Sequence, residues 1–328
     1  MYRSSCAFAA FAFLAVSSAE SAELRMVTAF PEGFVLTREL ARPFMDMVAE
    51  ETKGGISITL TGPDAVPPLE QFEPVQSGVF DLLFTHPAYH AGATSLGLAI
   101  DAMASDPAKR RESGVIDYLD RHYQKLGMKL VAAPVNGTYG FRYFLKEPIT
   151  GEPSFAGRKI RGTVSYHPMI EALGGTGVVM GGGDVYSALQ TGVLDGAAWS
   201  LTGALDFKWY EVAGYIADPV FGQVGAMIFM NLDAWNALTP EVQQAVDRAA
   251  ARLEATSVVR FDVLAEEEKN ALIEKGMKLT QFPAAEAERL NALFSEGVWK
   301  VAAKGAPEDA GELRALGATA GLTAAAAD

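Results

Sequence analysis

Residues 239–276 read TPEVQQAVDRAAARLEATSVVRFDVLAEEEKNALIEKG, the longest helical pattern in the chain. The stretch opens with an N-cap threonine, a first-turn proline and an early acid, Glu241. From Glu241 to Lys275 there is no glycine or proline, and Gly276 is a typical stop signal. At 1.5 Å per residue, roughly 35 residues make a helix about 50 Å long. Such a helix is longer than one small lobe, so we expect it to run across two lobes; the alternative is two helices with a break near Val263.

Strand-like and helix-like segments alternate before this helix. The chain has 328 residues, of which 49% are hydrophobic and 20% charged, enough for two lobes. Strands are expected at 24–28, 56–60, 81–85, 129–133, 141–145, 159–162, 178–180, 196–200 and 225–231, and helices at 37–52, 69–77, 113–126, 166–173 and 184–191. This rhythm predicts an α/β fold with mostly parallel sheets flanked by helices. The alanine-rich tail after Leu316 is expected to fray.

The N-terminus predicts export from the cytoplasm. Arg3 precedes an apolar run, Ala7 to Val16, that has the length of a signal-peptide core and is too short to span a membrane. We expect residues 1–22 to be a signal peptide cleaved after Ala19 or Ala22; an N-terminal helix packed on the protein is the alternative. Outside this segment there is no cysteine, so neither disulfides nor thiolate chemistry is expected. The net charge of −13 and the lack of a basic run argue against nucleic acid and against anionic membranes as partners.

No recognisable catalytic or cofactor signature is present. The chain lacks Gly-x-Ser-x-Gly, His-Glu-x-x-His and P-loop motifs. His86 and His90 are a weak metal pair because Pro87 separates them, and the glycines at 181–183 do not fit the spacing of a dinucleotide fingerprint. The sequence therefore predicts no catalytic residue, no metal site and no cofactor. Residues 136–138, Asn-Gly-Thr, match a glycosylation acceptor, which we discount in an exported protein of bacterial type.

Two arginines in apolar surroundings are the candidates for binding an anion. Arg142 lies within an apolar strand, where a buried guanidinium needs an anionic or multi-acceptor partner. Arg161 ends a short strand, and ligands bind at strand ends in open α/β sheets. Guanidinium matches a carboxylate with two parallel hydrogen bonds. Internal pairing with Asp or Glu stays open for both and fits Arg142 better than Arg161.

Two segments carry a resemblance to a known family. Residues 155–161, FAGRKIR, resemble a Gly-x-Lys-x-Arg segment, and residues 184–196, DVYSALQTGVLDG, resemble a Glu-Val-Tyr-x-Ala-Leu-Gln-x-Gly-Val-Val-Asp-Gly motif. Both are typical of the solute-binding proteins of tripartite ATP-independent periplasmic (TRAP) transporters. Residues 235–243 also resemble the segment that leads into the long hinge helix of that family. The similarity spans essentially the whole mature chain and is strongest over 139–250.

The resemblance implies a two-lobed periplasmic-binding-protein fold, type II-like, in which the long helix spans both lobes. Lobe I would comprise 23–138 plus 226–260, and lobe II 139–225 plus 261–328, with the ligand cleft between them. The implied function is capture of an organic monocarboxylate in the periplasm, by hinge closure, for the integral membrane permease subunits of a TRAP transporter. We expect a monomer that is not itself inserted in the membrane. A periplasmic sensing module that docks on a receptor and an exported enzyme on the same fold are the alternatives.

The resemblance also assigns the pocket. The main carboxylate-binding arginine falls on Arg161 and a second pocket arginine on Arg142. The other candidate ligand-binding residues are Trp199, His86, Tyr89, Tyr166, Gly182 and Phe34. Where the family often has an aromatic residue and an asparagine, this chain has Gly182 and Trp199, so the pocket is reshaped. The aromatic wall favours an acid with an aromatic or hydrophobic body or a 2-oxo or 2-hydroxy group, to which His86 would donate.

Overall fold

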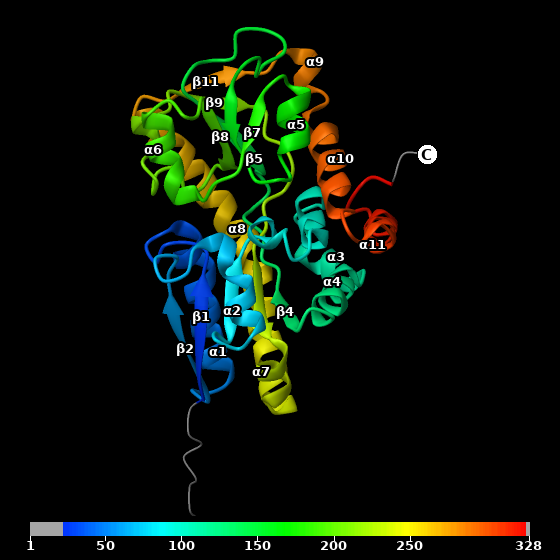
Figure 1. The fold of residues 1–328 in the computed structure, drawn as a ribbon. Coiled ribbons are helices and arrows are strands. Elements are labelled where there is room, and N and C mark those ends of the chain that lie inside the picture. The colour runs from blue at the N-terminus through cyan, green and yellow to red at the C-terminus, as the bar shows by residue number, and fades with distance from the viewer. Residues whose placement is uncertain (1–21, 326–328) are drawn as a thin grey trace, which may run out of the picture.

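Two separate β-sheets form the centres of two lobes in the computed structural model, which describes residues 22–325 (Figure 1). The predicted signal peptide lies outside the described residues except for Ala22, which begins the first strand. The strands and helices that surround each sheet alternate along the chain as the sequence predicts. The fold is therefore α/β.

The first sheet has the strand order β2-β1-β3-β10-β4. Its strands are β1 (Ala22–Thr28), β2 (Ile56–Thr61), β3 (Leu82–Thr85), β4 (Met128–Ala132) and β10 (Met227–Asn231). β1 is parallel to β2 and to β3, whereas β10 is antiparallel to both its neighbours. All residues of β3 and β10 are buried, as in strands covered on both faces.

The second sheet has the order β11-β9-β5-β8-β6-β7. Its strands are β5 (Phe141–Leu145), β6 (Lys159–Arg161), β7 (Thr176–Val178), β8 (Gly196–Ser200), β9 (Tyr215–Asp218) and β11 (Lys278–Gln281). All pairs are parallel except those that β5 makes with β8 and β9. Each sheet is thus parallel apart from one strand.

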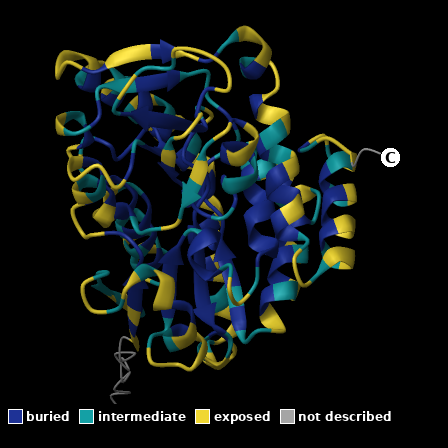
Figure 2. Ribbon diagram, turned by 45° about the horizontal axis from the view of Figure 1, so that its top comes forward, coloured by how far each residue is buried: buried dark blue, intermediate teal, exposed yellow. Residues whose placement is uncertain are grey.

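Helices cover both sheets; most residues of the inner strands are buried, dark blue in Figure 2, whereas the edge strand β11 is mostly exposed. In chain order they are η1 (Thr37–Ala41), α1 (Arg42–Glu51), η2 (Pro68–Glu70), α2 (Phe72–Gln76), η3 (Pro87–His90), η4 (Leu96–Ala102), α3 (Pro107–Glu112), α4 (Val115–Gln124), α5 (His167–Ala172), η5 (Gly182–Asp184), α6 (Val185–Gln190), η6 (Trp209–Glu211), α7 (Leu232–Ala237), α8 (Pro240–Glu274), α9 (Ala284–Ala287), α10 (Leu290–Ala302) and α11 (Pro307–Thr319). Among the described residues no helix has both the length and the apolar character of a membrane span.

The long helix α8 is unbroken, so the alternative with a break near Val263 is wrong. The side chain of Thr239 caps it by accepting a hydrogen bond from the N–H of Val242 at 3.4 Å. α8 packs on α1 and β4 of the first lobe and reaches the second lobe beyond them (Figure 1). Most of its buried apolar residues, among them Phe261, belong to a hydrophobic cluster that contains core residues of both lobes.

The C-terminal helix α11 packs on α4 and η4 of the first lobe, which differs from the expectation that all of 261–328 lies in lobe II. Leu313 and Ala310 are buried with Val115 and Leu119 of that lobe. The preceding helix α10 contacts both η4 and α5, so it carries the chain back between the lobes. The helix also continues to Thr319, past the point where fraying was expected. The remaining lobe boundaries stay a prediction.

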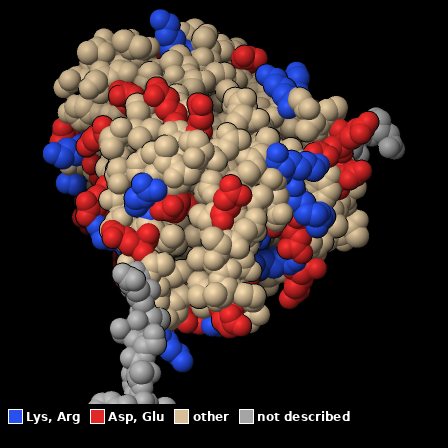
Figure 3. All heavy atoms as spheres, turned by 60° about the horizontal axis from the view of Figure 1, so that its bottom comes forward, with Lys and Arg blue, Asp and Glu red and all other residues tan. Residues whose placement is uncertain are grey.

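Acidic and basic side chains are interspersed on the face shown in Figure 3, and no basic patch forms on it. This mixed surface agrees with the net charge of −13. This face therefore offers polyanions no basic area to bind.

Phe261→Ala should lower the free energy of unfolding by about 3–5 kcal/mol, because it leaves a cavity where α8 joins the two lobes. Urea unfolding of the purified protein measures this loss. The matched control is Val259→Ala on the same helix, where the side chain is 70% exposed and the change should stay within about 0.5 kcal/mol. Equal losses in the two variants would contradict the role assigned to Phe261.

Candidate functional site

A small pocket lies between the lobes, with a cavity volume of about 40 Å³ counted as space open to the centre of a water molecule. Since one water needs about 10–15 Å³ on this measure, only a compact molecule fits. The pocket is lined by Phe30, Leu36, His86, Tyr89, Asn136, Phe141, Arg161, Thr163, Tyr166, Trp199, Ser200, Val224 and Gly225. Most of these residues follow or end the strands β1, β3, β6 and β8, so the site lies where ligands bind in open α/β sheets.

Arg161 is the charged group of this pocket. It is the last residue of β6 and is 1% exposed. Its Nε and Nη2 donate to the carbonyl of Met180 at 3.1 and 2.9 Å, and its Nη1 donates to the carbonyl of Ala198 at 3.0 Å. No carboxylate of the described residues forms an ion pair with it. The guanidinium therefore has neutral acceptors but no counter-ion, an arrangement that is costly until an anion arrives.

Trp199 and Tyr89 complete the surroundings of this guanidinium. The Cζ of Arg161 lies 4.6 Å from the ring centroid of Trp199, a cation–π contact that orients the charge. Burial raises the pKa of Tyr89, while the charge of Arg161 and hydrogen bonds from Arg161 and the Gly182 N–H partly offset this rise. Burial raises the pKa of Tyr166 well above its ordinary value too. Both phenols are thus neutral donors at pH 7.

The two departures from the family pattern are linked in space. A Cβ at Gly182 would lie 2.7 Å from Cη2 of Trp199 and 3.0 Å from the ring of Phe207. The large side chain at 199 therefore fills the room that a side chain at 182 would need. Gly182 consequently acts by its lack of a side chain.

Phe34 does not line the pocket but supports its wall. Its ring stacks on Phe207 at 4.5 Å and meets the edge of Trp199 at 6.2 Å. A Cβ at Gly203 would come within 2.4 Å of the Phe34 ring, and φ at Gly203 is +105°. Only glycine allows this close approach of the two lobes.

His86 lines the pocket, but the protein already engages both its ring nitrogens. Nδ1 accepts a hydrogen bond from the N–H of Ala88 at 3.2 Å, so Nε2 carries the hydrogen and donates to Asp101 at 3.1 Å. A hydrogen bond from His86 to a ligand would require one of these to break. The ring therefore contributes surface to the pocket in this conformation.

Arg142 does not line the pocket. It is buried and pairs with Asp218 at the end of β9, so the alternative of internal pairing describes it. Burial lowers its pKa, against the opposing charge of Glu266. A role of Arg142 in binding would be indirect, through the potential of the second sheet.

Asn136 is a pocket residue that sequence reasoning missed. It is 4% exposed, and within residues 22–325 neither its Oδ1 nor its Nδ2 has a hydrogen-bond partner. Its sequence context carried only the signal of a glycosylation acceptor. Its place in the pocket depends on how the segment between β4 and β5 crosses from one lobe to the other, which local pattern does not reveal.

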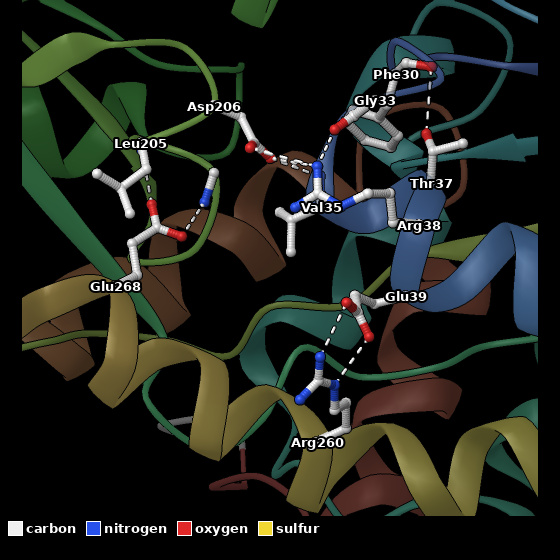
Figure 4. Close-up of polar contacts among 11 residues, drawn as sticks. Phe30, Gly33, Val35, Thr37, Arg38, Glu39, Leu205, Asp206, Arg260 and Glu268 are labelled. Carbon is white, nitrogen blue, oxygen red and sulfur yellow. Dashed lines mark hydrogen bonds and ion pairs between the residues drawn. The ribbon is translucent and has the colours of Figure 1, made fainter. Parts of the chain in front are cut away.

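Polar contacts connect the lobes beside the pocket (Figure 4). Asp206, in the loop after β8, accepts a hydrogen bond from the N–H of Val35 at 2.7 Å and lies 3.3 Å from Nη1 of Arg38. On the opposite side of this loop, Glu268 of α8 accepts hydrogen bonds from the N–H groups of Gly203 and Leu205 at 2.8 and 2.9 Å. The long helix thus holds the loop that touches the first lobe.

Glu268 titrates near neutral pH. Burial raises the pKa of its carboxyl to about 7, although the N–H groups of Leu205 and Gly203 favour the charged form. In the described part of the chain, no three His, Cys, Asp or Glu side chains gather as a metal site would require. The pocket offers a buried cation, neutral donors and apolar walls.

Comparisons with known proteins agree with this arrangement. A family model described as "Bacterial extracellular solute-binding protein, family 7" matches residues 26–304. The chain is 26% identical over 280 residues to the monocarboxylate 2-oxoacid-binding periplasmic protein of Nostoc sp. This alignment covers 79% of this chain and 73% of that protein.

Solved structures share the fold. A Bordetella pertussis extracytoplasmic solute receptor binding pyroglutamic acid matches with a TM-score of 0.80 at 22% identity, over 91% of this chain and 100% of that one. A TRAP periplasmic solute binding protein from Desulfovibrio salexigens, with bound orotic acid, matches with a TM-score of 0.81 at 19% identity. This match covers 91% of this chain and 98% of that one. The predicted two-lobed α/β fold is therefore confirmed.

Stability should fall with rising pH because of Glu268. Its native pKa of about 7 exceeds the ordinary value of 4.5, so the stabilising contribution is complete below pH 4.5 and is lost as pH rises through 7. Between pH 5 and 8 the wild type should lose about 2.5 kcal/mol of unfolding free energy, whereas Glu268→Gln, which cannot ionise at this position, should not. Urea unfolding at several pH values measures both curves. The control Glu267→Gln, at the exposed neighbour, should retain the wild-type slope; a matching slope in Glu268→Gln would refute the assignment.

Proposed function

The chain belongs to family 7 of the bacterial extracellular solute-binding proteins, and on this basis we propose that it captures a small organic monocarboxylate in the cleft around Arg161. Proteins of this family are the periplasmic receptors of TRAP transporters; they bind small molecules, work with membrane permease components and are not enzymes. For this chain we propose a monomer that is exported by the predicted signal peptide and delivers its ligand to such permease subunits.

The observation that carries the proposal is the buried guanidinium without a counter-ion. Three of the five N–H groups of Arg161 donate to carbonyl oxygens and a further hydrogen bond goes to Tyr89, which leaves donor capacity for a ligand carboxylate. A carboxylate bound there would neutralise the charge at low dielectric, where the ion pair is strong. Because the pocket is lined from both lobes, the acid favours the closed state through contacts that an open cleft lacks.

The lining supports an acid with a hydrophobic, flat or 2-oxo/2-hydroxy body. Trp199 and Tyr166 form walls, Tyr89 supplies a neutral hydroxyl near Arg161, and Phe34 and Gly182 shape the wall from behind. The relatives are in keeping with this: the Nostoc protein is named for 2-oxoacids, and the two structural neighbours hold pyroglutamic and orotic acid. We assign Arg142 a supporting electrostatic role.

A thermal-shift panel of organic acids on the mature chain tests the function. It should include 2-oxo, 2-hydroxy, aromatic and cyclic monocarboxylates, and at least one should raise the melting temperature. An acid at about 100 times its dissociation constant stabilises by about 2.7 kcal/mol.

Arg161→Ala should weaken the best acid by about 3–5 kcal/mol, on the order of 200- to 4,000-fold. Calorimetry measures the dissociation constants. Arg161→Lys, which keeps the charge but loses the paired hydrogen bonds, gives a second reading if the alanine variant misfolds. The control is Arg158→Ala, since Arg158 donates to the carbonyls of Glu147 and Pro148 outside the pocket. Unchanged affinity in both Arg161 variants would remove this residue from the site.

A further inference from the structure

We propose that Asn136 recognises the body of the ligand, and that this ligand carries, besides its carboxylate, an amide whose N–H and C=O lie side by side. A lactam or a primary carboxamide has this shape. The inference rests on the proposed function, because Arg161 is assigned there to the carboxylate.

The first step is the state of the Asn136 side chain. It lines the pocket and is 4% exposed, and neither Oδ1 nor Nδ2 has a partner in the described part of the chain. Its backbone N–H donates to the carbonyl of Val224 at 2.9 Å, and Val135 next to it bridges to Gly225. The residue is thus fixed by its main chain, while its amide is left without a bond. Buried amides almost always have partners, so one is expected from outside the chain.

The second step is the contrast with the other polar residues of the lining. The hydroxyl of Thr163 pairs with that of Ser165 at 3.0 Å, and the hydroxyl of Ser200 donates to the carbonyl of Thr202 at 2.7 Å. His86 uses both its nitrogens within the protein. Among the described lining residues, Asn136 therefore stands out as the polar side chain whose donor and acceptor are both unsatisfied.

The third step is chemical complementarity. The side-chain amide of Asn136 presents an acceptor, Oδ1, and a donor, Nδ2–H, on neighbouring atoms. A ligand satisfies both at once when it offers a donor beside an acceptor. A trans secondary amide points its N–H and C=O in opposite directions, whereas a lactam ring holds them on one side. A ketone or a second carboxylate supplies acceptors only; it could accept from Nδ2 but would leave Oδ1 unpaired.

The fourth step is the remainder of the pocket. Arg161 provides the charged end, and Leu36, Phe141 and Val224 add apolar surface. The volume admits only a compact molecule. A small ring that bears a carboxylate and a cis-amide and otherwise consists of methylene groups fits this pocket. The carboxylate would pair with Arg161, the amide with Asn136, and the methylene groups with the apolar lining.

The test compares acids that differ only in the amide. Pyroglutamate is paired with cyclopentanecarboxylate, which has the same ring size and carboxylate. Succinamate is paired with 4-oxopentanoate, which keeps the carbonyl and replaces the NH2 by a methyl group. Calorimetry should show that the wild-type protein prefers the amide in at least one pair by on the order of 100-fold, about tenfold for each of two hydrogen bonds. The pair that responds tells a lactam from a carboxamide.

Asn136→Leu should reduce the ratio of the two affinities within that pair to about one. The loss should fall mainly on the amide-bearing acid, since it makes more hydrogen bonds to Asn136 than its amide-free counterpart. Without ligand, this variant should be at least as stable as the wild type, since it removes two unsatisfied buried groups. Asn136→Ala is the second variant, should the larger side chain disturb packing. The control Arg158→Ala changes a residue outside the pocket and should keep the amide preference.

Equal affinities within both pairs in the wild type, or a preference that survives in Asn136→Leu, would overturn the inference. Failure of all four acids to bind would overturn it too. The proposed function fails separately, when no acid of the wider panel binds in a way that depends on Arg161.

Discussion

A positive charge enclosed between two lobes, that of Arg161, is the constraint around which the site is built. The carbonyl oxygens of Ala198 in β8 and of Met180 in the segment after β7 accept from the guanidinium, and Trp199 covers one of its faces. These contacts fix the orientation of the charge without cancelling it. A carboxylate that enters the cleft therefore meets a donor group already in place, and little reorganisation opposes binding.

Aromatic packing determines the shape around this charge. Trp199, Phe207 and Phe34 bring together residues from the two lobes, and they do so because Gly182 and Gly203 have no side chains. An enlarged residue at 199 and a missing one at 182 are thus a single structural adjustment. The wall that results excludes water from the guanidinium, which strengthens its interaction with an anion.

Local pattern predicted much of this molecule. An uninterrupted helical pattern without glycine or proline predicts α8, and a charged residue at a strand end predicts the position of Arg161. Local sequence pattern could not predict contacts between segments that are far apart in the chain. Arg142 pairs with Asp218, α11 returns to the first lobe, and Asn136 enters the pocket from a crossing segment; each depends on tertiary packing that no window of sequence contains.

The polar contacts across the cleft contribute little to its closure. The ion pair between Arg38 and Asp206 is solvated, with side chains 44% and 29% exposed, and such pairs contribute about 0–1 kcal/mol. The loop that carries Asp206 is in turn held by Glu268, whose burial already opposes ionisation at neutral pH. These polar contacts therefore position the lobes, while the packing of Phe34 on Phe207 and Trp199 contributes the apolar contact across the cleft. Under the proposed function, a ligand that pairs with Arg161 would add a difference in free energy between open and closed states, and the occupied form would then persist long enough to be recognised by a permease.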